Sequence, residues 1–405
     1  MRLHRNLVFT TIDSLMAIFN EEEYADKVVA RALKKDKRWG SHDRKFVAET
    51  IYEIVRWKRL YAEIAEVKEP FDRDKIWRIF AVWAVLRGYT LPDWKYFEDT
   101  PVRRIKGKFD ELTKTRKFRE SIPDWMDELG VKELGEETWT KELAAQNEQA
   151  KVILRVNKLK TTKEKLRAIL MDLNIETEFH KDYPDALILT ERANVFLTDA
   201  FKDGLFEVQD ASSQLVAYFL DVKPGMRVVD TCAGAGGKTL HLASLMENKG
   251  QLIAMDLYES KLKQLKIRAK RNGAFNIEPR VIESTKTIKK LYDKADRVLI
   301  DAPCSGLGVL KRNPDSKWKL QPEFIDNIRK VQAEVLENYS KIVKPGGKLV
   351  YATCSVLPSE NQEQIKHFLS TEIGKEFTFV EDKKVLAHES GFDGFYMALL
   401  ERKNK

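Results

Sequence analysis

The chain has 405 residues, of which 43% are hydrophobic and 33% charged, a composition typical of soluble globular proteins rather than disordered or fibrous ones. Its length predicts two or three domains, and its longest apolar run, residues 79–86, is far shorter than the roughly 20 residues that span a bilayer. Lys and Arg outnumber Asp and Glu by 71 to 63, which fits a polyanionic partner, and three cysteines exclude a disulfide scaffold and favour a cytoplasmic protein.

The first 145 residues predict consecutive helices. Apolar side chains recur at spacings of three, four and seven, which places them on one helix face: Val47, Ile51, Ile54, Tyr61 and Ile64. A second apolar helix is predicted over residues 77–86, with Gly88 placed to end it. Residues 103–119 are strongly basic, which predicts either a solvated face or loop or a surface that contacts phosphates.

The pattern changes near residue 151. Short β-rich runs at residues 152–156 and 186–189 flank a helical pattern at 162–173, which predicts a small α+β module. After Pro224-Gly225, strands alternate with helices: the predicted strands are 227–230, 251–256, 278–282, 297–301 and 348–353, and the predicted helices are 239–246, 259–271 and 322–343. This alternation predicts an open parallel sheet with helices on both faces, and the last β-like run, 395–400, predicts an edge strand.

Each of the three cysteines follows the end of a predicted strand. Cys232 follows the strand at 227–230, Cys304 the strand at 297–301, and Cys354 the strand at 348–353. Free cysteines usually act as small buried hydrophobic residues, but that reading explains one cysteine at this edge better than three. Ligands of such sheets bind at the carboxyl ends of the strands, so the cysteines indicate a site there. Their wide spacing and the shortage of His argue against a metal site.

A glycine-rich loop joins the first of these strands to a helix, with the sequence Asp230-Thr-Cys-Ala-Gly-Ala-Gly-Gly-Lys-Thr239. Glycines let a ligand approach the backbone and its free amides. A P-loop would need glycine at position 232, and a dinucleotide loop would need glycine at position 239, so neither pattern fits. Asp256 ends the next strand about 20 residues later, where a carboxylate accepts ribose hydroxyls or caps a helix. A nucleoside without a phosphate cradle indicates S-adenosylmethionine rather than NAD or ATP.

Three motifs together resemble the RsmB/Nop2/Sun family of RNA cytosine-C5 methyltransferases: the glycine loop, Asp301-Ala-Pro-Cys-Ser-Gly-Leu-Gly308, and Tyr351-Ala-Thr-Cys-Ser355 with Glu360-Asn361. Further matches are residues 154–157, 208–213, 312–315 and 393–395, so the resemblance covers residue 151 to the end. Residues 41–44 and 52–57 resemble the NusB-like helical domain of the bacterial RsmB (Sun/Fmu) branch, which acts on 16S rRNA. Two departures are Gly234-Ala235, where the family has Ala-Pro, and Glu283-Ser284-Thr285, where it has an Asp near the adenine.

The resemblance implies three domains. They are a NusB-like helical RNA-binding domain at 1–145, a small α+β RNA-binding module at 146–215, and a Rossmann-like S-adenosylmethionine-dependent methyltransferase domain at 216–405. The residues expected to bind the cofactor are Cys232, Ala233, Gly234, Ala235, Gly236, Gly237, Lys238, Asp256 and Asp301. The residues expected to bind RNA are Arg103, Arg104, Lys106, Lys108, Arg155, Asn157 and Arg312.

Cytosine C5 becomes nucleophilic enough to accept a methyl group only after a thiolate adds to C6, so one cysteine must act as a nucleophile. Chemistry alone does not choose between Cys304 and Cys354. The resemblance implies that Cys354 is the nucleophile, that Cys304 assists product release, that Asp301 binds and activates the cytosine, and that Lys238 lies near the catalytic centre, where its charge favours a thiolate. The base must leave its stack, which indicates single-stranded or loop RNA.

We therefore expect a monomeric, metal-free enzyme that methylates C5 of a cytosine in RNA, with 16S rRNA as the first choice of substrate. Two alternatives remain open: a cytosine-5 methyltransferase acting on tRNA or another RNA, and a catalytically inactive RNA-binding factor of ribosome assembly. DNA cytosine methylation is disfavoured, because it would place the nucleophile in the Pro-Cys motif and leave Thr-Cys-Ser unexplained.

Overall fold

The computed structural model describes residues 3–404 and divides into two compact units. The helical unit comprises Met1–Glu148 together with Leu310–Pro322, and the catalytic-motif unit comprises Gln149–Val309 together with Glu323–Lys405. Residues 310–322, here called the inserted segment, thus belong to the helical unit although the chain on both sides of them belongs to the other unit. The division into three domains with boundaries at 145 and 215 stays a prediction.

The helical unit contains helices joined by short loops, and its bounds are α1 (Arg5–Asn20), α2 (Ala25–Ala32), α3 (Ser41–Arg56), α4 (Lys58–Ile64), α5 (Arg73–Leu86), η1 (Lys95–Phe97), α6 (Val102–Leu112), α7 (Arg116–Arg119), α8 (Asp124–Leu134), α9 (Glu136–Asn147) and, from the inserted segment, α16 (Ser316–Lys319). The five residues of the predicted apolar face are all buried, but the prediction of one helix is wrong, because the chain breaks at Trp57 and divides them between α3 and α4. Gly88 adopts a φ of +75° just after α5, and its amide donates to the carbonyl of Val85, so the predicted helix end is confirmed.

Buried polar contacts hold the inserted segment. The Lys317 ammonium group donates to the carbonyl oxygens of Arg56 at 2.8 Å and Glu120 at 3.3 Å. The indole nitrogen of Trp318 donates to the carbonyl of Val55 at 2.7 Å. Burial lowers the pKa of Lys317 well below its usual range, and the hydrogen bonds to these carbonyl oxygens offset part of the cost of placing this polar group in the interior. The segment is therefore a built-in part of the helical core.

The catalytic-motif unit begins with a small antiparallel sheet whose strand order among the described residues is β2-β3-β1-β4. Its elements are β1 (Ile153–Val156), α10 (Lys163–Asp172), β2 (Thr177–Phe179), β3 (Ala186–Leu189), η2 (Val195–Leu197), α11 (Asp199–Lys202) and β4 (Phe206–Val208). The predicted β runs and the helix between them correspond to β1, β3 and α10. The short β2 and β4 were missed, because three residues give too brief a pattern to recognise.

The large sheet of this unit has the strand order β10-β11-β9-β8-β5-β6-β7 within residues 3–404. Its elements are α12 (Ala211–Phe219), β5 (Arg227–Asp230), α13 (Gly237–Leu245), β6 (Gln251–Asp256), α14 (Glu259–Asn272), β7 (Ile277–Val281), α15 (Thr285–Lys289), β8 (Ala295–Asp301), α17 (Pro322–Ser340), β9 (Val343–Thr353), η3 (Pro358–Glu360), α18 (Gln362–Ser370), η4 (Gly374–Glu376), β10 (Phe377–Val385), α19 (Ala387–Ser390) and β11 (Phe395–Arg402). Strands β7, β6, β5, β8 and β9 run parallel, and β11 runs antiparallel to both of its neighbours, β9 and β10.

The prediction that residues 395–400 form the edge strand is wrong, whereas the predicted parallel sheet is present as five parallel strands that β11 and β10 extend. β11 lies between β9 and β10, and β10 forms the edge. Most side chains of β10 are exposed, and only Phe377 and Val385 at its ends are buried. A charged edge strand discourages pairing with other chains, but it lacks the apolar pattern by which a strand is recognised.

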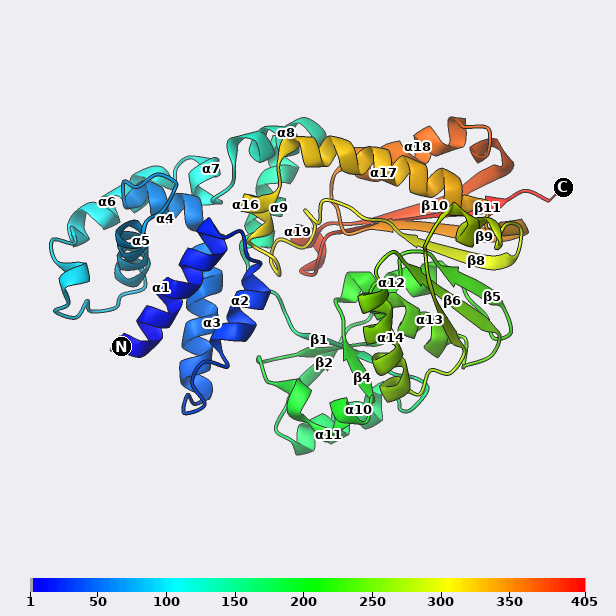
Figure 1. The fold of residues 1–405 in the computed structure, drawn as a ribbon, viewed down its shortest axis with the longest axis horizontal. Helices are drawn as coiled ribbons and strands as arrows, with labels where there is room; N and C mark the ends of the chain where they lie inside the picture. Colours follow the sequence, from blue (N-terminus) through cyan, green and yellow to red (C-terminus); the bar gives the residue numbers. More distant parts are fainter. Residues whose placement is uncertain (1–2, 405) are drawn as a thin grey trace. The chain divides into compact units, whose positions relative to one another are not determined.

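Helices cover both faces of the large sheet, as predicted (Figure 1). Alternate strand residues belong to opposite cores, so Val228 packs with α12, α13 and α14, whereas the adjacent Val229 packs with α15, α17 and α18. From β5 the chain continues to β6 and β7 on one side of β5, and it then crosses to β8 and β9 on the other side. The direction in which strands are added therefore reverses between β5 and β8. The carboxyl ends of these two strands are therefore where a ligand site is expected. None of the helices in residues 3–404 combines the length and apolar character needed to cross a membrane.

Candidate active site

The glycine loop follows β5 and leads into α13. Gly234 and Gly236 adopt φ values of +55° and +89°, which side chains disfavour. A Cβ atom on Gly236 would lie 2.1 Å from Leu265, so glycine is also required there for space. In contrast, a Cβ on Gly234 or Gly237 would meet nothing within 4 Å. One side of the loop is thus packed tightly, while these two residues face open space.

Asp256, at the end of β6, fixes this loop. Its Oδ2 atom accepts a hydrogen bond from the Gly234 amide at 2.9 Å, and its Oδ1 atom accepts one from the Tyr258 amide at 2.9 Å. The second bond lies in the turn before α14, whose N-cap residue is Tyr258 rather than Asp256, so Asp256 holds that turn and the glycine loop without capping the helix. Each carboxylate oxygen keeps a further lone pair, which leaves the ribose-binding role open.

Asp230 and Cys232 lie at the end of β5, where burial favours the neutral form of each side chain. Burial raises the pKa of Asp230 to about 7, although the hydroxyl of Thr239 donates to its Oδ2 atom at 2.7 Å. Burial also raises the pKa of the Cys232 thiol, and the nearby carboxyl groups of Asp230 and Asp301 act in the same direction. Cys232 is therefore an unreactive thiol.

Lys238 and Asp301 form an ion pair at the switch point, with 2.7 Å between the Lys238 Nζ and the Asp301 Oδ2 atoms. Burial opposes the charge of Lys238, but Asp301 and Cys354 outweigh it and raise the pKa of the ammonium group. The ammonium group also lies 4.9 Å from the centre of the Phe395 ring. A lasting positive charge therefore sits beside the candidate nucleophile.

The structure brings Cys304 and Cys354 together. Their Sγ atoms are 3.3 Å apart, although 50 positions separate them in the sequence. The contact with Cys354 and burial raise the pKa of the Cys304 thiol well above its usual range. The Cys304 loop also packs on Cys354, because the Gly308 amide donates to the Cys354 carbonyl at 2.9 Å and a Cβ on Gly308 would lie 2.8 Å from that oxygen. The four predicted catalytic residues therefore form one cluster.

Arg155 and Asn157 were expected to contact RNA, but both side chains are buried. Arg155 is 1% exposed and Asn157 4%. The Arg155 guanidinium donates to the carbonyl of Gly237 in the glycine loop, and burial lowers its pKa to about 10. The Asn157 amide donates to the carbonyls of Gly204 and Asn272 at 2.7 and 2.8 Å. Both side chains support the glycine loop and α14 from the small sheet, and neither reaches a surface that RNA could contact.

Two polar residues that were not predicted extend this support. Arg268 on α14 donates to the carbonyl of Ala235 in the glycine loop at 2.7 Å and to Glu207 at 2.9 Å. Glu207 on β4 is buried and also accepts from Asn272. The sequence contains no local pattern for these contacts, because they connect β4 of the small sheet, α14 and the glycine loop of the large sheet, which are distant from one another in the sequence.

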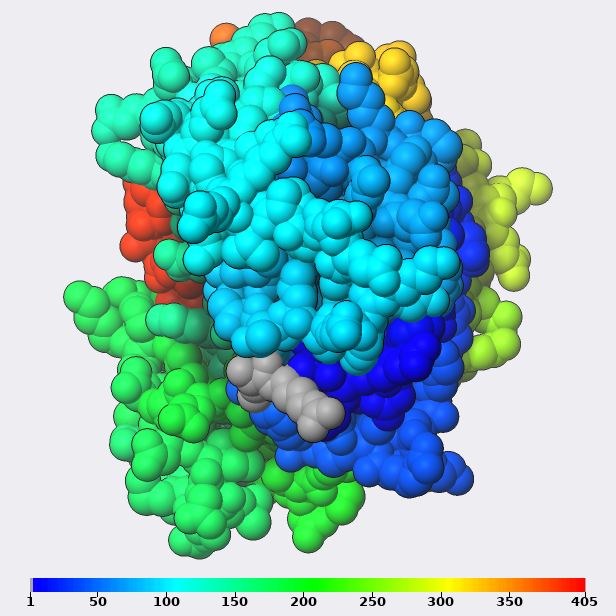
Figure 2. Space-filling model, turned by 90° about the vertical axis from the view of Figure 1, so that its left-hand side faces the viewer, coloured from blue at the N-terminus to red at the C-terminus, as the bar shows by residue number. Residues whose placement is uncertain are grey.

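The basic stretch forms α6 and α7, so the loop considered from the sequence is excluded. Figure 2 shows the cyan part of the chain, which includes α6, at the surface of the helical unit. Arg104 and Lys108 both pair with Glu66, at 2.5 and 2.6 Å. Arg103 and Lys106 are exposed and form no ion pair with any described residue. Arg312 lies half-buried in the inserted segment. Any role of these residues in RNA binding stays a prediction.

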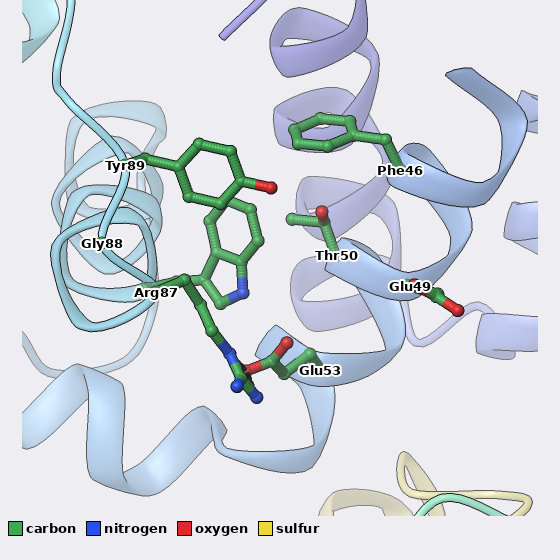
Figure 3. Close-up of a pocket in the computed structure, with 8 residues that line it drawn as sticks. Phe46, Glu49, Thr50, Glu53, Arg87, Gly88 and Tyr89 are labelled. Carbon is green, nitrogen blue, oxygen red and sulfur yellow. Dashed lines mark hydrogen bonds and ion pairs between the residues drawn. The ribbon is translucent and has the colours of Figure 1, made fainter. Parts of the chain in front are cut away.

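The helical unit contains its own cavity of about 260 Å³ (Figure 3). Glu53 of α3 and Arg87 at the end of α5 point toward one another across it and form an ion pair. The cavity is lined by Phe46, Glu49, Thr50, Glu53, Trp83, Arg87, Gly88 and Tyr89, none of which is a predicted site residue. We place the chemistry at the cysteine pair, where a nucleophile, a cation and a carboxylate meet. Within residues 3–404, no cluster of three or more His, Cys, Asp or Glu side chains is arranged to hold a metal ion.

Comparison with known proteins gives consistent matches. The family model described as 16S rRNA methyltransferase RsmB/F matches residues 217–401, and the model of the ferredoxin-like domain of RsmF/B-like methyltransferases matches residues 122–196. The probable ribosomal RNA small subunit methyltransferase B of Synechocystis sp. is 30% identical, covering 96% of this chain and 97% of its own length. The ribosomal RNA small subunit methyltransferase B of Vibrio vulnificus is 33% identical, covering 94% of this chain and 86% of its own.

Solved structures share the fold. The crystal structure of PH0851 superposes with a TM-score of 0.84 at 26% identity and covers 99% of this chain and 100% of its own. The structure of NSun6 from Pyrococcus horikoshii with SFG has a TM-score of 0.65 at 21% identity and covers 71% of this chain and 100% of its own. At that identity the second likeness shows the fold alone.

Proposed function

This chain belongs to the RsmB/F family of 16S rRNA methyltransferases, and we propose that it methylates C5 of a cytosine in 16S rRNA in the cytoplasm, with S-adenosylmethionine as the methyl donor. The observation that carries the proposal is the pair of thiols 3.3 Å apart near a half-buried ammonium group. Methyl transfer to a base nitrogen or to a ribose oxygen would give neither thiol a chemical role. Methylation of C5 in a pyrimidine ring, in contrast, requires a thiolate that adds to C6.

The residues around the glycine loop fit S-adenosylmethionine. The open space at Gly234 and Gly237 allows a ligand to approach the backbone, and the spare lone pairs of Asp256 suit the two ribose hydroxyls. No phosphate cradle is needed, because S-adenosylmethionine carries none, and its methyl sulfonium group supplies an electrophilic carbon. Lys238 lies at the start of α13 and Asp301 at the end of β8, so both lie between this loop and the cysteines.

Cys354 is the proposed nucleophile. The thiolate of Cys354 forms a C–S bond to C6 of the base, and the charged Lys238 ammonium group interacts with Cys354 electrostatically. The electron pair released toward C5 then forms the new bond to the methyl carbon, while the bond from that carbon to the sulfonium sulfur would break and its electron pair would stay on sulfur. The proton on C5 must leave to a base, the C–S bond breaks, and the thiolate departs. Asp301, paired with Lys238, offers an acceptor for the cytosine amino group.

Cys304 is proposed to assist the release step. Its raised pKa keeps it as a thiol, so it is a proton donor rather than a competing nucleophile. With its sulfur atom 3.3 Å from that of Cys354, it lies within reach of the adduct that Cys354 forms. Alanine at position 304 should therefore leave the first addition intact and impair the departure of the product.

Methylation assays with purified RNA test the proposal. Small ribosomal subunits and tRNA from cells that lack the gene are incubated with the enzyme and S-adenosylmethionine labelled in the methyl group. We expect label in 16S rRNA, one new protected cytosine on bisulfite sequencing, and loss of both with Cys354→Ala. Label found only in tRNA would make tRNA, rather than 16S rRNA, the substrate. Label without a protected cytosine would refute methylation at C5.

The roles of the two cysteines are separated by trapping. Cys304→Ala protein incubated with substrate RNA should accumulate a covalent protein–RNA adduct that survives denaturing electrophoresis, whereas the double variant with Cys354→Ala should not. An adduct from the Cys354→Ala variant but none from the Cys304→Ala variant would reverse the assignment. RNA binding without methylation by the unaltered chain would instead favour an RNA-binding factor without activity.

A further inference from the structure

One buried carboxylate joins the two cysteine loops. The side chain of Glu360 is 0% exposed. Its Oε1 atom accepts hydrogen bonds from the hydroxyls of Ser305 at 2.5 Å and Ser355 at 2.6 Å. Its Oε2 atom accepts from the Ser305 amide at 2.8 Å and from the Gln332 amide group on α17 at 2.9 Å. The residue that follows each cysteine is therefore bound to the same carboxylate.

The residues before the cysteines are held from the same place. The Gln332 amide group also donates to the carbonyl of Pro303, directly before Cys304, at 2.9 Å. The neighbour of Glu360, Asn361, accepts from the Thr353 hydroxyl, directly before Cys354, at 2.5 Å. Each cysteine thus lies between two fixed residues, although neither sulfur atom contacts Glu360.

A carboxylate is the group that suits this position. It accepts about four hydrogen bonds and donates none, and all four contacts of Glu360 come from donors. Burying an ionised carboxylate is costly unless such bonds compensate, and Glu360 forms no ion pair with any described residue. The uncharged isostere glutamine would turn two accepting positions into donors and place them against the donors of Ser305, Ser355 or Gln332.

We propose that Glu360 is a positioning residue that holds the sulfur atoms of Cys304 and Cys354 at the separation at which both reach one cytosine. The inference rests on the proposed function for its meaning, since the separation matters when both thiols act on one base. Glu360 itself touches neither the base nor the cofactor site. Its loss should slow the covalent steps and leave S-adenosylmethionine binding unchanged.

The matched pair of variants is Glu360→Gln and Glu363→Gln. Glu363 is exposed at the start of α18 and forms no contact with another described side chain, so the second variant makes the same chemical change without touching the loops. We expect Glu360→Gln to lower kcat about 100-fold, the effect of a misplacement near 1 Å, with KM for RNA within about twofold. Glu363→Gln should match the unaltered chain in both quantities.

A second readout measures the cysteine geometry without any RNA. Diamide removes two electrons and two protons from a thiol pair, which forms one S–S bond while diamide becomes the hydrazine. With Cys304 and Cys354 3.3 Å apart, the unaltered chain should form this disulfide readily, leaving Cys232 as a free thiol. The rate of disulfide formation, followed by mass spectrometry, should fall at least tenfold in Glu360→Gln and stay unchanged in Glu363→Gln.

The outcomes separate the two proposals. Unchanged disulfide rates and unchanged kcat in a folded Glu360→Gln variant would overturn the positioning role. A slower disulfide in a chain that does not methylate RNA at all would overturn the proposed function and leave the positioning role in place. If Glu360→Gln does not fold, Ser305→Ala and Ser355→Ala each remove contacts while keeping the carboxylate, and wild-type disulfide rates in both would refute the inference.

Discussion

Mild acid should destabilise the catalytic-motif unit through one buried histidine. His241 on α13 is 1% exposed, and its Nε2 atom lies 2.8 Å from the Oδ2 atom of Asp185. Burial lowers the pKa of His241 to about 4, with Arg155 and Lys158 acting in the same direction and the bond to Asp185 acting against them. The Nδ1 atom is buried and has no partner among the described residues, so the neutral ring donates through Nε2 and protonation would leave a buried N–H group unpaired.

The size of the effect follows from the shift. A histidine in the unfolded chain has a pKa near 6.5, so in mild acid the unfolded state binds the proton first. Because the folded pKa is the lower one, the stabilisation is complete above pH 6.5 and is lost as the pH falls toward 4. Integration between those values gives a loss of about 2 kcal/mol at pH 5 and about 3 kcal/mol at pH 4.

Urea unfolding at pH 7.5 and pH 5 measures this loss. His241→Gln retains a donor for Asp185 and cannot be protonated, so its stability should fall by about 2 kcal/mol less than that of the unaltered chain over this interval. His367→Gln, which replaces an exposed histidine on α18, serves as the control and should follow the unaltered chain. Equal losses in the unaltered chain and His241→Gln would refute the reasoning, because the buried ring would then carry no part of the acid sensitivity.

Asp256→Ala should weaken S-adenosylmethionine binding roughly 10- to 150-fold in calorimetry, since a charged acceptor is lost, and an unchanged affinity would leave Asp256 only as a support of the glycine loop. Arg103→Gln combined with Lys106→Gln should weaken RNA binding and reduce the slope against salt by about 1.4, and an unchanged slope would make α6 a solvated face. Gly236→Ala should lower the melting temperature and abolish cofactor binding, because its φ is +89° and a Cβ has no room. The control is Gly107→Ala in α6, where the added Cβ meets nothing within 4 Å. If the Gly236→Ala and Gly107→Ala variants melted at the same temperature, the packing argument would be contradicted.

The sequence predicted the position of the active site because that position depends on local patterns. Apolar runs bounded by polar residues define β5, β8 and β9, and a parallel sheet brings their carboxyl ends to one edge. The meeting of Cys304 and Cys354 follows from that rule together with the family motifs. The edge strand β10 was not predicted, because residues 381–384 in its middle are charged and most of its side chains are exposed. It therefore lacks the regular alternation of apolar residues on which such predictions depend.

The polar interior could not be predicted in the same way. Arg155 lies in one of the segments that match the family and was expected to bind RNA. Its carbonyl acceptor, that of Gly237, is 82 positions away, and nothing local to either residue shows that they meet. The four donors of Glu360 likewise come from three separate segments. Polar contacts of this kind depend on the finished tertiary packing rather than on local propensity.

The inserted segment affects how this protein can evolve. An exchange of the first 148 residues between two related genes would separate Lys317 and Trp318 from the backbone carbonyls that hold them, and would leave a buried ammonium group to find new acceptors. Such a recombinant would be tolerated only if the incoming helices offered those acceptors, or if the inserted segment were exchanged as well. The parts of the gene that encode residues 1–148 and 310–322 must therefore be inherited together, although most of the coding sequence of the catalytic-motif unit lies between them.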